Sequence, residues 1–229
     1  MKIALLGLGK MGKMVQELAP ARHHETLPIS RNTSEELKKT LLQKADIAID
    51  FSHPSAVLPH LQLCIEQRIN LVIGTTGWDE HLPEIKALLA NSSIGCLYGP
   101  NFSIGIAFFK RIAAHAASLL APDYDLAGIE YHHRTKVDAP SGTSKELVRE
   151  ISQTHPSYLH FQFSSVRCGH ITGIHTLLFD SPTDTITLTH QSRHRQGYAL
   201  GALKAAEWLQ NKQGYYSFSD YLGASDHAH

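Results

Sequence analysis

The chain has 229 residues, of which 42% are hydrophobic, so it can form one large or two modest domains and is too apolar for a disordered protein. Lysine plus arginine and aspartate plus glutamate number 21 each, which argues against a strong overall attraction to nucleic acid or to a membrane surface. Three cysteines without a CxxC pair, and no apolar run near the ~18 residues of a membrane span, predict a cytoplasmic protein without disulfides.

The first part of the chain alternates between strand and helix patterns. Strands are predicted at residues 3–6, 25–30, 45–51, 70–73 and 94–98, and helices at 13–18, from 32–36 onward, at 55–67 and at 82–90. The opening run MKIALLGLGKMG favours a strand that enters a glycine turn over a cleavable signal. Strands and helices that alternate with short connections form parallel sheets with right-handed crossovers. We therefore predict a fold of the α/β class with a Rossmann-like doubly wound parallel sheet.

The pattern changes near residue 102. A long helix is predicted at 102–120, a strand at 126–131, a helix at 145–151, strand-like runs at 161–163, 165–167, 175–179 and 185–189, a last helix at 198–209, and then a polar tail. Strands that follow one another predict an α+β domain with an antiparallel or mixed sheet. We therefore predict a dinucleotide-binding domain of residues 1–102, completed by residues 196–229, and a substrate-binding and oligomerisation domain of residues 103–195.

Three glycines, Gly7, Gly9 and Gly12, form a GxGxxG turn directly after the first predicted strand. Glycines allow this turn to be tight and let backbone N–H groups at a helix N-terminus reach a pyrophosphate. The acidic residue usually found at the end of the second strand is replaced by Ser30 and Arg31, which suit a 2′-phosphate. We predict NADPH as the preferred cofactor and NADH as a second one. The alternative is that Arg31 is only a solvated surface residue.

Further small or polar turns follow the later strands, at residues 50–52, 74–77 and 99–103. In a doubly wound sheet, ligands bind beyond the carboxyl ends of the strands. Each turn alone could be a simple connection. Three of them in the expected places predict contacts with the ribose and nicotinamide end of the cofactor.

A basic run, His132–Lys136, lies between the predicted strand at 126–131 and a Pro-Ser-Gly-Thr turn. Thr143 and Glu146 have the spacing of a capping box, so a helix N-terminus with free N–H groups is expected beside the basic run. A second basic cluster lies at 192–195. Together these groups suit a small substrate with two carboxylates. The alternative is an ordinary solvated basic loop.

The run EYHHRTKVDAPSGTS resembles the signature of the 4-hydroxy-tetrahydrodipicolinate reductase (dihydrodipicolinate reductase) family of lysine and diaminopimelate biosynthesis. The segments GLGKMG, DFSHP, VIGTTGW, GPNFSIGI, VRCGHITGIHTLLF and GALKAAEWL follow in that family's order, so the similarity covers nearly the whole chain. The resemblance implies NAD(P)H-dependent reduction of 4-hydroxy-tetrahydrodipicolinate (dihydrodipicolinate) to tetrahydrodipicolinate. It also implies a homotetramer formed through the sheets of the second domain.

The same resemblance implies the roles of individual residues. His132 is placed as proton donor or acceptor and Lys136 as the catalytic acid. The substrate-binding residues are His133, Ser141, Gly142, Thr143 and Arg195. For the cofactor, the resemblance implies contacts by Gly7, Met11, Gly12, Gly74, Thr76, Asn101 and Phe102. The glycine turn and the strand-end turns described above add Gly9, Lys10, Ser30, Arg31, Phe51, Ser52, Thr75 and Pro100 as predicted cofactor-binding residues. The 16 histidines include neither an HExxH motif nor a Cys/His quartet, so no metal site is predicted.

Departures from the family pattern leave the cofactor preference open. His53 stands where some members carry arginine, and Ser30-Arg31 replaces an acid–arginine pair. Two other functions are considered. One is a different NADP-dependent dehydrogenase of the aspartate pathway, whose phosphorylating type would need a catalytic cysteine such as Cys64 or Cys168. The other is a non-enzymatic NADPH sensor, which would bind the cofactor without turnover.

Overall fold

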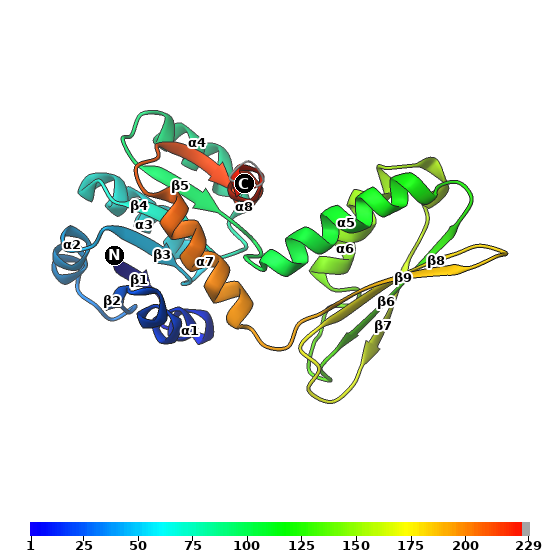
Figure 1. The fold of residues 1–229 in the computed structure, drawn as a ribbon. Coiled ribbons are helices and arrows are strands. Elements are labelled where there is room, and N and C mark those ends of the chain that lie inside the picture. The colour runs from blue at the N-terminus through cyan, green and yellow to red at the C-terminus, as the bar shows by residue number, and fades with distance from the viewer. Residues whose placement is uncertain (226–229) are drawn as a thin grey trace. The chain divides into compact units, whose positions relative to one another are not determined.

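The computed structural model describes residues 1–225, so the last four residues of the predicted segment 196–229 lie outside the described residues. The described chain divides into two compact units (Figure 1). Unit 1 consists of Met1–Ser103 together with the segment that begins at Gln196, and unit 2 consists of Ile104–Arg195. In the part of the chain that the structure describes, no helix is long and apolar enough to cross a membrane.

Unit 1 contains a six-stranded sheet in the order β10-β5-β4-β3-β1-β2. Its strands are β1 (Lys2–Leu6), β2 (Glu25–Ile29), β3 (Ile47–Asp50), β4 (Asn70–Ile73), β5 (Gly95–Tyr98) and β10 (Gly214–Ser217). All neighbouring strands are parallel, and the strand order reverses where β1 lies between β2 and β3. This confirms the predicted Rossmann-like doubly wound sheet. The carboxyl ends of β1 and β3 lie at the reversal point, where such folds bind ligands.

Helices surround this sheet because its central strands are mainly apolar and buried. They are α1 (Lys10–Leu18), α2 (Glu35–Gln43), α3 (Pro54–Gln67), α4 (Leu82–Ala90), α7 (Gln196–Leu209) and α8 (Phe218–Ser225), with 3₁₀ turns η1 (Pro20–Arg22) and η2 (Asp79–His81). Helix α7 packs with α1 and against β3, β4 and β5, whereas α2 packs with α3. Residues such as Leu6, Ile49 and Ile73 are completely buried between these layers.

The end of the chain differs from the prediction. Residues 214–217 form β10, which pairs in parallel with β5, and α8 follows at once. The backbone N–H and the hydroxyl of Ser217 both donate to the carboxylate of Asp220, which fixes the junction between β10 and α8. The predicted polar tail was therefore wrong at these residues, because the strand is half-buried along its length and has no clear alternation.

Unit 2 contains a four-stranded mixed sheet in the order β7-β6-β8-β9. Its elements are α5 (Ile104–Leu120), β6 (Asp125–His132), α6 (Gly142–Ser152), the 3₁₀ turn η3 (Pro156–Tyr158), β7 (Phe163–Arg167), β8 (Ile174–Asp180) and β9 (Thr185–Gln191). Strand β6 is parallel to β7 and antiparallel to β8, and β8 is antiparallel to β9. This confirms the prediction of a second, mixed sheet. A core that includes Phe109, Leu147, Leu177 and Phe179 joins α5 and α6 to the sheet.

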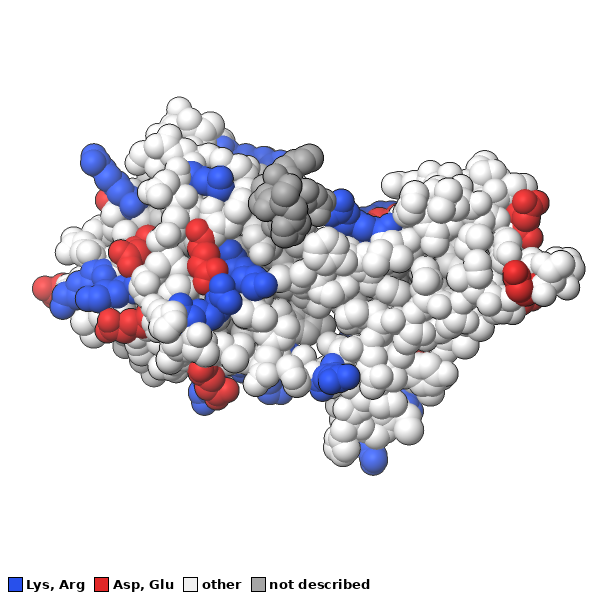
Figure 2. Space-filling model, viewed as in Figure 1, with Lys and Arg blue, Asp and Glu red and all other residues white. Residues whose placement is uncertain are grey.

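In the view of Figure 2, no large area of the surface carries charge of one sign. On the face drawn in Figure 2, lysine and arginine side chains are mixed with aspartate and glutamate over unit 1. Over unit 2, most of the face in view carries neither charge. Charge can therefore select a ligand only locally, in cavities and loops.

Candidate active site

The glycine turn between β1 and α1 is closely packed, and no side chain caps the start of α1. Gly7 has a φ of +95°, and a Cβ there would lie 2.4 Å from the carbonyl oxygen of Phe51. A Cβ on Gly12 would lie 2.0 Å from the carbonyl oxygen of Gly7. Gly9 is the N-cap of α1 and provides no capping side chain, and a Cβ there would meet nothing within 4 Å. The first turn of α1 is therefore open to an anion.

A cavity of about 560 Å³ lies beside this turn, within the size range of small-molecule sites. It is lined by Gly7, Leu8, Gly9, Ile29, Ser30, Arg31, Lys38, Phe51, Ser52, His53, Ala56 and His60. The predicted residues Ser30 and Arg31 are thus brought together with the glycine turn. The sequence interpretation missed Lys38 on α2 and His60 on α3, because only the packing of these helices places them at the cavity.

A second cavity of about 440 Å³ continues along the same edge of the sheet. It is lined by Gly9, Lys10, Met11, Phe51, Ser52, Pro54, Gly74, Thr75 and Thr76, and it shares Gly9, Phe51 and Ser52 with the first cavity. A Cβ on Gly74 would lie 2.1 Å from the ring of Phe51. Glycine at position 74 therefore makes room for the Phe51 ring beside this turn.

Four predicted cofactor residues do not line either cavity: Gly12, Pro100, Asn101 and Phe102. Gly12 is buried under the turn. The ring of Phe102 is buried against Phe51 and Phe218, at centroid distances of 6.2 and 4.8 Å. The side-chain oxygen of Asn101 accepts a hydrogen bond from the N–H of Ser103. The Phe102 side chain is therefore part of the core of unit 1.

A buried carboxylate, Asp50 at the end of β3, holds the turns of the second cavity in place. Its Oδ1 accepts hydrogen bonds from the Ser52 N–H at 2.8 Å and from the Thr75 hydroxyl at 2.7 Å. Its Oδ2 lies 2.7 Å from Nδ1 of His60. An acidic residue at the end of an otherwise apolar strand was the signal for this role in the sequence.

His132 and Lys136 lie at the end of β6 in unit 2. His132 is 8% exposed, and a Cβ on Gly173 would come within 3.0 Å of the His132 ring, so glycine there makes room for it. Burial lowers the pKa of His132, and the nearby cations Lys136 and Arg167 lower it further. Nε2 of His132 has no hydrogen-bond partner within the described residues.

The loop after β6 is ordered by short-range contacts. Nζ of Lys136 lies 2.6 Å from Oδ1 of Asp138, and this ammonium group lowers the pKa of the Asp138 carboxyl. Nδ1 of His133 lies 2.8 Å from the hydroxyl of Thr135. The basic run therefore forms a turn with internal contacts at the surface of unit 2.

The second basic cluster is tied to the same region. The N–H of Ser192 donates to the carbonyl of Gly173 at 2.8 Å, and the hydroxyl of Thr172 donates to the carbonyl of Arg193 at 3.4 Å. Since Gly173 contacts the His132 ring, these bonds bring the start of the cluster beside the end of β6. Arg195 itself is exposed at the end of unit 2.

The N-terminus of α6 differs from the predicted capping box. Ser141 is the N-cap, and its hydroxyl accepts from the N–H of Ser144 at 3.2 Å. Glu146 pairs instead with Lys110 of α5 at 3.0 Å. The prediction was wrong because Pro-Ser placed the cap two residues earlier than Thr143. Within the described residues, the N–H groups of Gly142 and Thr143 donate no hydrogen bond, which leaves them free for a carboxylate.

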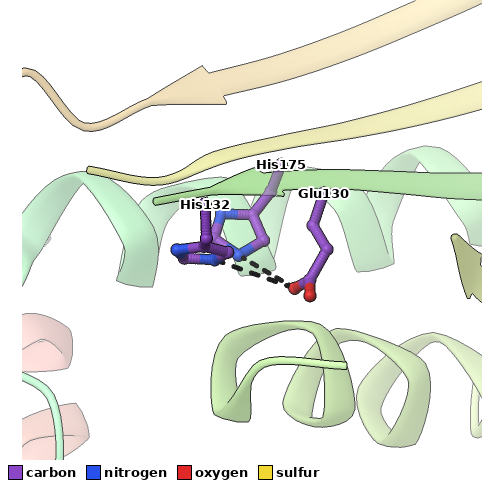
Figure 3. A group of neighbouring side chains, drawn as sticks. All are labelled: Glu130, His132 and His175. Atoms are coloured by element: carbon purple, nitrogen blue, oxygen red, sulfur yellow. Dashed lines mark ion pairs between the residues drawn. The ribbon is translucent and has the colours of Figure 1, made fainter. Parts of the chain in front are cut away.

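Glu130, His132 and His175 form a buried group on the inner face of the sheet (Figure 3). One ligand atom from each lies within 4.8 Å of the others, a spacing that a metal ion could use. The Glu130 oxygens, however, accept hydrogen bonds from Ser165 at 2.7 Å and from the Arg167 guanidinium at 2.9 Å. The positive charge of this guanidinium group would repel a metal cation. The buried group is therefore better suited to hydrogen bonding than to holding a metal ion.

Comparison with protein families finds matches over almost the whole chain. Residues 1–102 match the N-terminal domain of dihydrodipicolinate reductase, and residues 105–222 match the C-terminal domain of the same enzyme. The 4-hydroxy-tetrahydrodipicolinate reductase of Christiangramia forsetii is 32% identical over 236 residues, covering 97% of this chain and 98% of the relative. That of Neisseria meningitidis serogroup A is 33% identical over 268 residues, covering 99% and 98%.

Among solved structures, a similar one is dipicolinate-bound dihydrodipicolinate reductase from Paenisporosarcina sp. TG-14. The TM-score is 0.79 and the sequence identity 26%, and the match covers 95% of this chain and 97% of that one. A probable dehydrogenase from Thermotoga maritima, with 8% identity and a TM-score of 0.59, shares the fold alone.

Proposed function

The chain belongs to the dihydrodipicolinate reductase family, and from this we propose that it uses NAD(P)H to reduce 4-hydroxy-tetrahydrodipicolinate (dihydrodipicolinate) to tetrahydrodipicolinate in lysine and diaminopimelate biosynthesis. The observation that carries this proposal is the arrangement at the end of β6. His132 and Lys136, which can supply a proton, come from the same short segment that leads into the open N-terminus of α6. Reduction of a ring with two carboxylates needs both a proton source and a site that binds a carboxylate.

Recognition of the substrate rests on positive groups of unit 2. The free N–H groups of Gly142 and Thr143 would bind one carboxylate, aided by the partial positive charge of the α6 N-terminus. His133 and Arg195 would face the other carboxylate. Ser141 has an indirect part, because its own N–H and hydroxyl are used within the protein. The dipicolinate bound to the relative from Paenisporosarcina supports a dicarboxylate ring as the ligand.

Proton delivery falls to Lys136 and His132. Loss of water from the 4-hydroxy ring gives dihydrodipicolinate, which contains a conjugated C=C–C=N system. Bound NAD(P)H would supply a hydride to this system, and a proton must meet the electron density that the hydride adds. The ammonium group of Lys136 would move from Asp138 to the substrate and donate that proton. His132 is buried, its Nε2 makes no hydrogen bond within the described residues, and it would donate or accept the proton at the ring. General acid catalysis of this kind accelerates reactions by about 10²- to 10⁴-fold.

The glycine turn and its two cavities fit a dinucleotide. Positions 7 and 12 exclude any side chain, and the uncapped N-terminus of α1 can bind a pyrophosphate. The first cavity, near β2, would take the adenosine end, and the second, near Gly74 and Thr76, the nicotinamide end. Pro100 and Asn101 line neither cavity, so they would contact only a part of the cofactor that extends out of these cavities.

Preference for NADPH would come from cations around the first cavity. Arg31 follows Ser30 at the end of β2, and Lys38 on α2 points toward the same space. The Lys38 side chain is 13% exposed and lies 2.6 Å from Glu35. The Lys38 ammonium group could leave Glu35 and bind the 2′-phosphate of NADPH. NADH has no 2′-phosphate and would not gain this contact. Lys39, the next residue, is half-exposed and pairs with Glu66 at 3.4 Å, so it is a matched control.

The direct test measures NADPH and NADH oxidation with substrate freshly made from pyruvate and aspartate semialdehyde. The wild-type chain should turn over, with a higher kcat/KM for NADPH. Arg31→Ala and Lys38→Ala should each lower kcat/KM for NADPH by about tenfold to a hundredfold and leave that for NADH nearly unchanged, because each removes one charged hydrogen bond. Lys39→Ala should change neither value. Cofactor binding without turnover would favour the sensor, and a tenfold preference for NADH would reject the NADPH assignment.

We propose a homotetramer formed through the outer face of the unit 2 sheet. Strand β6 directs Gly128, Glu130 and His132 inward, and therefore Ile129 and Tyr131 outward, where they are only half-buried. The outer face is continued by Val166, Thr176 and Leu178. An apolar sheet face of this kind is a common interface.

Light scattering tests this assembly. The wild-type mass should be four times the chain mass of 25.3 kDa. Leu178→Lys should reduce the mass, because it would place charges against one another in the interface. Leu119→Lys, on the exposed side of α5, should leave it unchanged. A wild-type monomer would contradict the proposal.

The cysteines do not support a thiol mechanism. Cys64 and Cys96 are buried, and burial raises the pKa of both thiols. Cys168 is exposed, and its thiol makes no hydrogen bond or ion pair within the described residues, whereas a nucleophilic thiol needs an adjacent base or cation. Three free thiols also support our proposal that the enzyme works in the reducing cytoplasm.

A further inference from the structure

Glu130 lies on the same face of β6 as His132. Residues two apart on a strand point to the same side, and both side chains are buried on the inner face of the sheet, toward α6. The cross-strand partner of Glu130 on β8 is His175. Figure 3 shows both imidazoles directed at the Glu130 carboxylate, with each Nε2 at 3.8 Å from Oε2.

The Glu130 carboxylate also anchors the N-terminus of α6. Oε1 and Oε2 lie 3.1 and 3.0 Å from the N–H of Ser141, and Oε2 accepts from the Ser144 hydroxyl at 2.6 Å. The Ser141 hydroxyl lies 3.2 Å from Nε2 of His175. The Glu130 carboxylate therefore fixes the start of α6, directly before the free N–H groups of Gly142 and Thr143. Glu130 belongs to β6, the strand that ends in His132.

Glu130 keeps its negative charge in this position. Burial by itself raises the pKa of its carboxyl, but hydrogen bonds from Ser141, Ser144, Ser165 and Arg167 outweigh burial and lower the pKa well below its usual range. His175 does not neutralise that charge, because burial and the neighbouring His132 lower its pKa to about 4. A proton on His132 would therefore face an ionised carboxylate across 3.8 Å.

The charged and titratable groups that face His132 come from each neighbouring element. They are Glu130 on β6, Arg167 on β7, His175 on β8 and Lys136 in the loop. From α6, the nearby polar groups are the hydroxyls of Ser141 and Ser144, which carry no charge. Glu130 is thus the one anion in this set, and Arg167 is the cation bonded to it.

We propose that Glu130 is a positioning residue of the reductase site: it holds the N-terminal turn of α6 for the substrate carboxylate, and its charge stabilises the protonated form of His132, with Arg167 opposing that effect. The inference rests on the proposed function for the identity of the substrate. The pairing of Glu130 with His132 is independent of the proposed function, because it exists in the protein without ligands.

The test measures the titration of His132 by NMR in ¹⁵N-histidine-labelled, unliganded protein, with its signal assigned by comparison with His132→Asn. Glu130→Gln, which keeps the size and one acceptor oxygen, should lower the His132 midpoint by about 1 to 3 pH units, the usual effect of losing an opposite charge at this range. Arg167→Gln should move the midpoint in the opposite direction. His115→Gln, which alters an exposed histidine of α5 in the same unit, should leave it unchanged.

A purely structural role would not produce opposite shifts. If both variants moved the midpoint in the same direction, or neither moved it, the proposal would be overturned. If Glu130→Gln failed to fold, Arg167→Gln would decide alone, and an unchanged midpoint there would reject the proposal. In the active enzyme, the pH at which kcat/KM falls should follow the two shifts. If the wild-type chain showed no turnover, the proposed function would be refuted. The His132 titration would still show whether Glu130 stabilises the protonated form of His132.

Discussion

Replacing Lys136 by alanine should lower kcat by about 10²- to 10⁴-fold, the range expected for loss of a general acid. The substitution removes the ammonium group that we propose as the proton donor. The only partner of that group within the described residues is Asp138, so folding should not suffer. The Kd for NADPH, measured by fluorescence titration, should stay within about twofold of wild type, because the cofactor cavities belong to unit 1.

Lys145→Ala is the matched control for this experiment. Lys145 lies nine positions further along the chain, on the exposed side of α6, and its removal changes the net charge by the same amount. Its kcat should equal that of wild type. If Lys136→Ala kept full kcat, Lys136 would have no part in proton transfer, and His132 would remain as the sole candidate.

Replacing Gly201 by alanine should destabilise unit 1 by about 3 kcal/mol or more, at the upper end of overpacking effects. Gly201 is buried in α7, and a Cβ there would lie 1.9 Å from the carbonyl oxygen of Phe102 and 2.9 Å from its carbonyl carbon. Backbone atoms cannot rotate away as a flexible side chain can. Either α7 or the segment around Phe102 must shift, and both are packed in the core.

Gly197 in the same helix supplies the control, because a Cβ at that position would meet nothing within 4 Å. Gly197→Ala should change stability by no more than about 1 kcal/mol, in the stabilising direction if helix propensity dominates. Urea unfolding followed by tryptophan fluorescence measures both variants. The chain has two tryptophans, Trp78 and Trp208, and both belong to unit 1. Equal midpoints for the two variants would contradict the expected clash.

Much of the fold could be predicted because its signals are local. Strand β4 and helix α4 agree with the predicted residues 70–73 and 82–90, since each is bounded by a glycine, proline or polar turn. Strand β3 is shorter than the predicted 45–51, and α1 begins at Lys10 instead of residue 13, because a glycine N-cap is less visible in a sequence than a serine or aspartate. Strand β10 could not be recognised, because pairing with β5, not its own pattern, makes it a strand.

The candidate site divides in the same way. The glycine turn and the basic run are contiguous in sequence, so their residue types alone indicated anion binding. Glu130 had a usable signal, its position two residues before His132 on a predicted strand. His175 and Lys38 had none, because only the register of β8 against β6 and the packing of α2 bring them to their sites. Long-range placement of this kind follows from tertiary structure.

The return of the chain from unit 2 to unit 1 has a consequence for biosynthesis. Helix α7, strand β10 and helix α8 are parts of unit 1 that leave the ribosome after the whole of unit 2, and β5 remains an open edge until β10 pairs with it. The whole of Ile104–Arg195 is synthesised before that point, so this unit can fold while the nucleotide-binding half is still waiting for its final strand. A chain truncated after Arg195 and released from the ribosome should accordingly protect the inserted half from protease and leave the first half susceptible.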